Sequence, residues 1–283
     1  MRPIQLPLWL TVGVFALAAC DRPSPEPRAL QLDEANQASE SIPPQESVEE
    51  AQPLANVAPA PEAKTAPVSE DDACPANMVL VEGEYCPKVK QTCLRYLDPP
   101  GRFEKFRCAE YKQPAECEGP KKKMKFCIDR DEYVAPNSSL PENHKSWTHA
   151  DQTCRAQGKR VCMESEWNFA CEGEEMRPYP YGFKRDPTAC NADHTDLVDA
   201  EGNLKDRRVP PGTYNRCVSP FGVRDMAGNL EEFVTIDGST PARPAMKGAY
   251  WQPSRNFCRA AQTAHDRYYN GTETGFRCCS DVD

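Results

Sequence analysis

The stretch SPFGVRDMAGNLEEF, residues 219–233, decides the character of the fold, because Pro, Gly, Asn and Asp recur too often for a long helix or strand. Gly228 allows a tight bend within it. The same residue types bound the short segments 247–251 and 275–279, which predicts short strands joined by long ordered loops. We therefore expect an α+β domain that is irregular and loop-rich, with few short helices and strands.

Two short helices are expected upstream of that stretch. Ser146 is suited to cap a helix that stops near Gly158 and buries Trp147, Ala150 and Cys154 on one face. A second short helix fits residues 164–171.

The chain begins with a pattern typical of an export signal. An apolar stretch leads to Leu17-Ala18-Ala19-Cys20 and is followed at once by charged residues, so it is too short to span a membrane. This site resembles the lipobox of bacterial lipoproteins, which predicts a signal peptide over residues 1–19 and acylation of Cys20, for example with palmitate. Two or more acyl chains would anchor the protein to a bacterial membrane on the extracytoplasmic side, as in the periplasm of the cell envelope. The alternative is an ordinary secretory signal cleaved after Ala19.

Residues 20–73 have the composition of a disordered tether. Residues 21–73 contain no aromatic residue and no Cys, and their 12 acidic against 3 basic residues give a charge of 3 − 12 = −9. This equals the net charge of the whole chain, so the remainder is close to neutral. A near-neutral domain without a basic aromatic patch excludes nucleic-acid binding. The short run Lys121-Lys122-Lys123 predicts a solvated loop.

The folded part, residues 74–283, is rich in cysteine. It holds 15 − 1 = 14 Cys besides Cys20, and an even, high count behind an export signal predicts disulfides. Zinc binding is disfavoured because the chain has no Cys-x-x-Cys pair and no His-Glu-x-x-His motif. The Cys-rich N-terminal part, residues 74–127, contains six cysteines whose 15 possible connectivities stay open. They are Cys74, Cys86, Cys93, Cys108, Cys117 and Cys127.

A series of segments resembles the sulfatase-modifying factor family, which includes the formylglycine-generating enzymes. The order and spacing hold from about Met78 to Cys279. The segments are IDRDEY (128–133), GKRVC (158–162), ESEWNFA (164–170), PYG (180–182), CN (190–191), residues 219–233, KGAYW (247–251) and GFRC (275–278). The resemblance implies a C-type-lectin-like fold. It also implies disulfides joining Cys154 with Cys278 and Cys171 with Cys258. We further expect Cys190 to join Cys217, and Cys162 to join Cys279.

The resemblance implies structural calcium as well. One site would use Asp225, Glu232 and the carbonyls of Gly228 and Leu230, because calcium prefers several oxygen ligands. A second would use Asn191, the Ala192 carbonyl and a group near Asn203. The alternative is that these acids and amides only cap turns.

The catalytic signature of the family is missing. The enzymes hold Cu(I) with two thiolates shortly after a Gly-Gly-Ser motif, whereas Gln252 and Phe257 occupy the thiolate positions here and Ala249 replaces the Ser. Cys258, the nearby thiol, is expected to pair with Cys171. We therefore expect no copper.

Two functions remain open. The first is a non-catalytic binding or assembly module that recognises a protein, peptide or glycan. The second is an oxidative enzyme of the formylglycine-generating or non-haem-iron superfamily acting on a cysteine or thiol. The second would need two His and one carboxylate for iron, and the spacing of His144, His149, His194 and His265 shows no such pattern.

Overall fold

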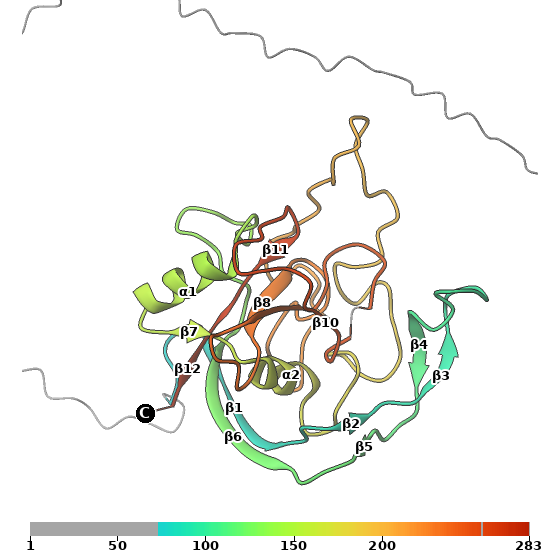
Figure 1. Ribbon diagram of the computed structural model, residues 1–283, viewed down its shortest axis with the longest axis horizontal. Helices are drawn as coiled ribbons and strands as arrows, with labels where there is room; N and C mark the ends of the chain where they lie inside the picture. Colours follow the sequence, from blue (N-terminus) through green and yellow to red (C-terminus); the bar gives the residue numbers. More distant parts are fainter. Residues whose placement is uncertain (1–72, 256, 283) are drawn as a thin grey trace, which may run out of the picture. The chain divides into compact units, whose positions relative to one another are not determined.

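The computed structural model describes residues 73–255 and 257–282 (Figure 1). The predicted signal peptide, Cys20 and the tether up to residue 72 lie outside the described residues. Within the described part, no helix has the length and apolar character needed to cross a membrane. The elements are β1 (Met78–Tyr85), β2 (Val89–Lys90), β3 (Cys93–Tyr96), β4 (Cys108–Tyr111), β5 (Glu116–Cys117), β6 (Lys122–Asp129), α1 (Trp147–Ala156), β7 (Arg160–Val161), α2 (Glu164–Glu172), β8 (Glu231–Thr235), β9 (Pro244–Lys247), β10 (Ala261–Gln262), β11 (Thr274–Gly275) and β12 (Cys278–Asp281).

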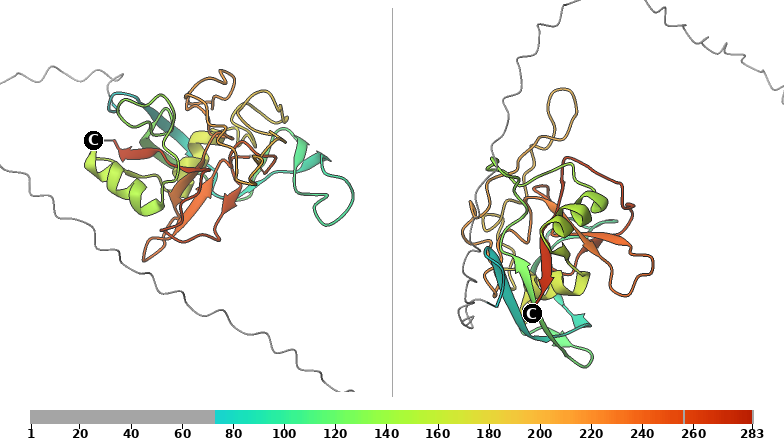
Figure 2. Two further views of the ribbon diagram at one scale, coloured as in Figure 1. Left: turned by 90° about the horizontal axis from the view of Figure 1, so that it is seen from above. Right: turned by 90° about the vertical axis from the view of Figure 1, so that its left-hand side faces the viewer.

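Residues 74–129 form a long antiparallel excursion that we call the ribbon. β1 pairs with β6 over eight residues, and the same two chain segments continue as β2 with β5 and β3 with β4. Figures 1 and 2 show the β3–β4 end extending away from the rest of the described chain. The predicted solvated loop at the lysine run is wrong, because Lys122 and Lys123 begin β6, although both side chains are exposed.

The six cysteines of the ribbon pair in a nested order. Cys74 joins Cys127, Cys86 joins Cys117, and Cys93 joins Cys108, so that the outermost cysteines pair together and the innermost pair together. Each disulfide therefore links the outgoing half of the ribbon to its returning half.

The remaining described residues, 130–255 and 257–282, form what we call the body. It is built on two four-stranded sheets, with strand orders β1-β6-β12-β7 and β10-β9-β8-β11. The ribbon enters the first sheet because β6 also pairs with β12. A core of buried side chains, among them Trp167, Phe169 and Val234, packs between α2, the ribbon base and the second sheet.

Both predicted helices are confirmed. Ser146 caps α1 by accepting a hydrogen bond from the His149 N–H at 3.2 Å, and Trp147, Ala150 and Cys154 are the buried face. α2 covers the predicted span and one further residue. Its first turn is satisfied by Glu166, which accepts from the Met163 N–H at 2.7 Å, and by Asp237, which accepts from the Ser165 N–H at 2.9 Å.

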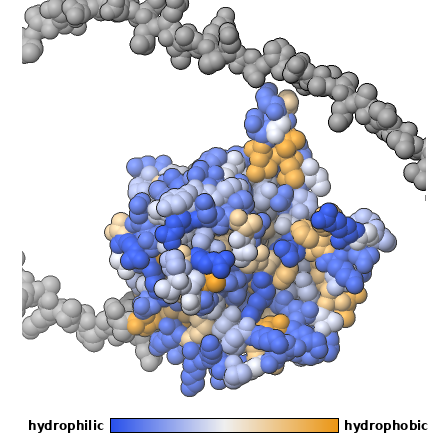
Figure 3. All heavy atoms as spheres, in the orientation of Figure 1, coloured by the Kyte–Doolittle hydropathy of each residue, from blue (hydrophilic) through white to orange (hydrophobic). Residues whose placement is uncertain are grey.

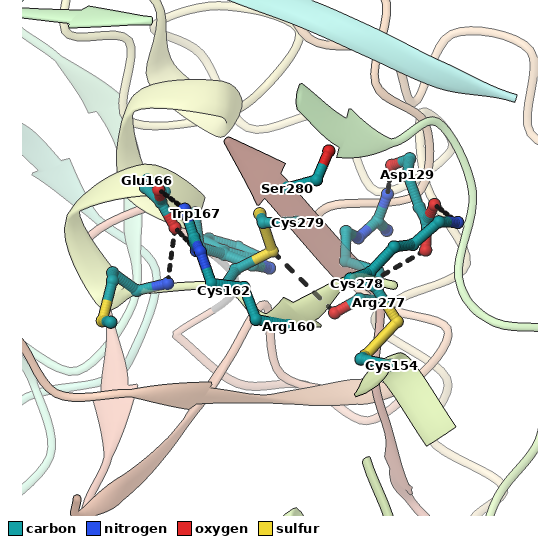
Figure 4. Close-up of a disulfide and its surroundings, with 12 residues drawn as sticks. Asp129, Cys154, Arg160, Cys162, Glu166, Trp167, Arg277, Cys278, Cys279 and Ser280 are labelled. Carbon is teal, nitrogen blue, oxygen red and sulfur yellow. Dashed lines mark hydrogen bonds and ion pairs between the residues drawn. A yellow bond between two sulfur atoms is a disulfide. The ribbon is translucent and has the colours of Figure 1, made fainter. Parts of the chain in front are cut away.

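Four long-range disulfides cross the body. The structure joins Cys154 to Cys278, Cys162 to Cys279, Cys171 to Cys258 and Cys190 to Cys217, the four pairs expected from the sequence. Figure 4 shows the first two side by side, because Cys278 and Cys279 are consecutive on β12. Together with the ribbon, all fourteen cysteines of residues 74–279 are in disulfides.

The predicted irregular, loop-rich and disulfide-rich α+β fold is confirmed. From Gly173 to Leu230 the described chain forms isolated bridges, such as Val198 with Leu204, in place of helices or laddered strands. Two expected strands differ in extent. Of residues 247–251 only Lys247 belongs to a strand, and the segment 275–279 is divided between β11 and β12.

Candidate functional site

A cavity of about 440 Å³ lies where the second sheet meets two loops of the body. One wall comes from residues 249–255, and another from β10 and the loop that follows it up to Glu273. Glu231 at the start of β8 supplies part of the remaining wall, and Phe106 contributes from the ribbon. Cavities of this size are typical of sites for small ligands or single side chains.

Two carboxylates stand next to each other in this cavity. β8 and β11 run parallel with Glu231 opposite Thr274, and the Glu231 N–H donates to the Glu273 carbonyl at 2.8 Å. Glu273 is the residue directly before β11, and both carboxylates line the cavity. A Cβ at position 271 would collide with the Glu273 carboxylate, so Gly271 allows that carboxylate its place.

The surroundings of Glu231 disfavour the charged form of its carboxylate. Burial and the neighbouring charge of Glu273 raise the pKa of Glu231 to about 7. Among the described residues, no Lys or Arg makes an ion pair with either carboxylate, and the Tyr269 hydroxyl donates to Glu273 at 2.6 Å. The two carboxylates therefore have no cationic partner among the described residues.

Aromatic rings line the same space. His265 stacks on Tyr269 with ring centroids 3.6 Å apart and planes 16° apart. Tyr250 lines the opposite loop, and burial together with the charges of Glu273 and Glu231 raises its pKa to about 12. At neutral pH the tyrosines are thus uncharged and present ring faces and hydroxyls.

The residues at the expected copper positions do not fit Cu(I). Gln252 lines the cavity with an amide, and Ala249, at the Ser position of the motif, adds a methyl group, neither of which is a soft ligand. Phe257 packs instead near Tyr111, with ring centroids 6.3 Å apart. The sulfur of Cys258 is fully buried in its disulfide with Cys171. All fourteen cysteines among the described residues are in disulfides, so the Cys258 sulfur is not available as a thiolate while its bond to Cys171 is intact.

Glu232, expected as a calcium ligand, already has a cationic partner. Its carboxylate accepts from the Arg277 guanidinium at 2.6 Å on both oxygens, and from the Trp167 Nε1–H at 2.8 Å. Both Glu232 and Arg277 are 1% exposed. The Glu232 carboxylate thus accepts three hydrogen bonds, and its charge is compensated by Arg277.

Asp225 has the open oxygen that Glu232 lacks. Its Oδ2 accepts from the Gly212 N–H at 2.7 Å, whereas its buried Oδ1 has no hydrogen-bond partner among the described residues. Burial raises its pKa to about 6. Of the two carboxylates in the first expected set, Asp225 is therefore the one with an oxygen free for a cation, and the described residues contain no group of three or more His, Cys, Asp or Glu with metal-binding geometry.

A residue that sequence reasoning missed, Glu132, completes this acidic region. It accepts from the Leu230 N–H at 2.9 Å and from the Asn229 side-chain amide. Burial, followed by the nearby charges of Glu232 and Asp225, raises its pKa well above the ordinary value. Gly228 is required next to it because a Cβ there would collide with the Asn191 carbonyl.

Among the described residues, no hydrogen bond joins Asn203 to Asn191 or Ala192, the other members of the second expected calcium set. Asn191 is buried and bonds through its amide to Asn229 at 2.9 Å and to the Arg207 carbonyl at 2.8 Å. Ala192 follows it, and its N–H donates to the Cys190 carbonyl at 2.9 Å. Asn203 lies instead at an exposed turn, where its N–H and side chain bond to Asp199. Its segment belongs to the loop that projects at the top of Figure 1.

The four histidines occupy separate surroundings. His265 lies in the cavity, His194 bonds to the Asn191 side chain at 2.9 Å, and His149 stands edge-on to Phe276. The His144 N–H donates to the Gly271 carbonyl. This distribution offers no pair of histidines for an iron site within the described part of the chain.

Comparisons with known proteins agree with the sequence motifs. The model of the sulfatase-modifying factor enzyme 1-like domain matches residues 96–282. A formylglycine-generating enzyme of Mus musculus is 24% identical over 181 residues, 53% of this chain and 47% of the mouse protein. The inactive C-alpha-formylglycine-generating enzyme 2 of Bos taurus is 27% identical over 121 residues, 40% of this chain and 38% of the bovine protein. The chain thus spans less than half the length of these curated relatives.

Solved structures of similar proteins include CarF and, from Pseudomonas aeruginosa, PvdO. CarF is 13% identical with a TM-score of 0.48, covering 74% of this chain and 99% of CarF. PvdO is 15% identical with a TM-score of 0.47, covering 72% of this chain and 94% of PvdO. Because the family model matches well over half of the chain, this protein belongs to the sulfatase-modifying factor enzyme 1-like domain family.

Proposed function

We propose that this protein is a non-catalytic binding module held at an extracytoplasmic membrane surface by acyl chains on Cys20. The observation that carries the proposal is the chemistry of the cavity. Its wall holds Gln252 at one of the two positions where the enzymes of the family need thiolates and Ala249 where their motif has a Ser, and Cys258 is joined to Cys171 in a disulfide. A cavity with carboxylates, aromatic rings and no thiolate is suited to bind a ligand rather than to oxidise one.

The family itself offers a parallel for a member without the enzyme activity. One of the similar proteins, from Bos taurus, is named an inactive formylglycine-generating enzyme. The alternative, an oxidative enzyme acting on a thiol, requires at least one reduced cysteine in this chain or two histidines around one metal.

A direct assay tests the absence of catalysis. The full chain in detergent, loaded with copper, is incubated with a peptide containing Cys-x-Pro-x-Arg, and mass spectrometry measures conversion of the Cys to an aldehyde. We expect no conversion. Conversion that is lost in Cys258→Ser would contradict the proposal and assign the activity to that sulfur.

Thiol counting gives an independent measurement. The full chain is alkylated under denaturing, non-reducing conditions and its mass is compared with that of the reduced and alkylated chain. We expect none of the fourteen cysteines of residues 74–279 to be alkylated before reduction. Two reactive thiols in the folded protein would favour the oxidative enzyme.

The anchor is tested by replacing its attachment site. Cys20→Ser removes the acylated sulfur, and we expect the exported protein to move from the membrane fraction to the soluble fraction. Asp21→Ser is a suitable control because it leaves the sulfur in place. Unchanged membrane fractionation of Cys20→Ser would exclude the lipid anchor.

A further inference from the structure

We propose that the cavity binds an organic cation, an alkylammonium or alkylguanidinium group, between the carboxylates of Glu231 and Glu273 and the rings of Tyr250 and Tyr269. This inference rests on the proposed binding function and names the chemical class of its ligand. It is independent of calcium and of copper.

The first argument is that the cavity carboxylates lack the arginine partner that several other carboxylates of the body have. Glu232 is paired with Arg277, Glu172 with Arg259 at 2.5 Å, and Asp193 with Arg185 at 2.5 Å. Removing a charge from water costs several kcal/mol unless a partner compensates, and the body supplies an arginine in each of these cases. Glu231 and Glu273 share one partly buried space and receive no arginine or lysine among the described residues. A cation from outside would fill that role.

The second argument is the kind of wall that surrounds the carboxylates. Cations bind favourably over aromatic faces, most strongly where water is excluded. Tyr250 lines one loop and Tyr269 the other, and the latter ring is fixed by stacking on His265 and by its hydrogen bond to Glu273. The Tyr269 ring is therefore held in place before any ligand arrives, which lowers the entropy cost of binding.

The third argument concerns the other charged group at the cavity. Arg255 lines it, but its side chain is exposed and its guanidinium lies over the Phe106 ring at 5.3 Å. In the described part of the chain, the Arg255 guanidinium makes no ion pair with Glu231 or Glu273. Arg255 therefore lies at the rim and does not neutralise the carboxylate pair.

Titration of the full chain with small probes tests the proposal. The probes are butylammonium and butylguanidinium, with neutral butylurea as the matched control, followed by calorimetry or ligand-observed NMR at pH 8. We expect the two cations to bind at least tenfold more tightly than butylurea. Equal affinity of the neutral probe, or no binding of either cation, would overturn the proposal.

Substitutions locate the binding site. The double variant Glu231→Gln with Glu273→Gln keeps the side-chain shape and removes both charges, and we expect it to weaken cation binding at least tenfold. Glu82→Gln removes a carboxylate that is exposed on the ribbon and should change nothing. Unchanged affinity in the double variant would contradict the proposal. If the double variant unfolds, Tyr250→Leu tests the same cavity, with an expected severalfold loss, and unchanged affinity there would contradict the proposal equally.

The pH dependence provides a second signature. Ionisation of Glu231 should strengthen cation binding as the pH rises through about 7, and Glu231→Gln should flatten that rise. His265, Arg255 and the two tyrosines face the same space, so the comparison is made between wild type and variant at each pH. If the protein binds the cation and also forms the aldehyde, the non-catalytic function is refuted and this inference stands. If the protein neither binds the cation nor forms the aldehyde, this inference is refuted and the non-catalytic function stands.

Discussion

The ribbon and the body use disulfides for different purposes. In the ribbon, three nested disulfides join cysteines 15, 31 and 53 residues apart, so each closes a hairpin upon itself. In the body, three of the four disulfides join cysteines 87 to 124 residues apart and connect residues 258–279 to residues 154–171. The ribbon is thus stapled locally, and the body is tied globally.

The difference follows from how much apolar surface each region buries. A two-stranded ribbon has little core of its own, and isolated hairpins are marginally stable in water. Leu94 and Phe103 at its far end are 60% and 62% exposed, and Figure 3 shows apolar side chains gathered at that end of the molecule. The body buries whole side chains such as Trp167 and Trp251, together with the Arg277–Glu232 ion pair. Covalent links replace a core in the ribbon and reinforce one in the body.

The largest expected effect comes from opening the body's paired disulfides. Cys154–Cys278 and Cys162–Cys279 run almost in parallel, so either one alone keeps the chain end attached. Removing one opens a ring of only about ten residues, which costs roughly 2.7 kcal/mol in the chain-entropy model. Removing both opens a loop that Cys171–Cys258 still limits to about 40 residues, for a total of roughly 6 to 7 kcal/mol.

This total is comparable to the whole stability of an ordinary domain. We therefore expect the four-alanine variant to be unfolded, and each two-alanine variant to fold with a lower midpoint of chemical denaturation. If each two-alanine variant lost half of the free energy of unfolding that the four-alanine variant loses, the two disulfides would act independently and would not share one loop.

Next in size is the loss of the buried ion pair in the body. Arg277→Met leaves the Glu232 carboxylate buried without a cation, which should cost about 3 to 5 kcal/mol in urea unfolding. Arg155→Met removes an exposed pair with Asp151 and should leave the free energy of unfolding nearly unchanged. Similar losses in the two variants would mean that the buried pair adds nothing beyond its surface counterpart.

Much of the body could be predicted from the sequence, whereas the ribbon could not. The helix over residues 147–156 has a cap, a periodic apolar face and a glycine stop, all of which are local signals. The six ribbon cysteines carry no such signal, because 15 pairings satisfy the count. The turn residues Asp98-Pro99-Pro100-Gly101, between the third and fourth of these cysteines, could have indicated a hairpin and hence nesting.

The candidate site shows the same limit. Glu232 lies within the expected segment, but its partner Arg277 is 45 residues away in sequence. The ion pair of its carboxylate therefore depends on tertiary structure. Glu132 is 98 residues from Leu230, whose N–H it accepts. The cavity carboxylates Glu231 and Glu273 meet only because β8 and β11 pair in parallel. Sequence patterns report periodicity and spacing along the chain, and none of these contacts is close along the chain.

A smaller effect is expected from Asp225, where calcium binding stays a prediction. Because its folded pKa of about 6 exceeds the unfolded value of about 3.9, metal-free protein should lose stability as the pH rises from about 4 to 6, by up to about 3 kcal/mol. Asp225→Asn keeps an oxygen for the Gly212 N–H and removes this dependence. Thermal melts in chelator at pH 4 to 8 measure the difference between wild type and variant.

Added calcium should raise the stability of the folded protein at neutral pH, opposite to the loss that ionisation of Asp225 causes in metal-free protein. At one hundred times its dissociation constant, a ligand that binds only the folded state stabilises it by about 2.7 kcal/mol. We expect that gain in the wild type and not in Asp225→Asn. Identical melts with calcium and with chelator would show that Asp225 only caps the turn at Gly212.

The smallest effect on global stability should come from the end of the ribbon. The double variant Cys93→Ser with Cys108→Ser opens a loop of 15 residues. β4 nevertheless keeps its backbone hydrogen bonds to the body, because the Tyr111 N–H donates to the Phe183 carbonyl and the Ala109 carbonyl accepts from the Arg185 N–H. The outer strand β3 has mostly exposed side chains and can separate without disturbing the core. We therefore expect the melting of the body to change by less than about 1 kcal/mol, while amide exchange rises in β3 and in residues 97–107. If removing this disulfide lowered the melting of the body as much as removing Cys162–Cys279, the ribbon and the body would unfold as one unit, and the distinction between local staples and global ties would be wrong.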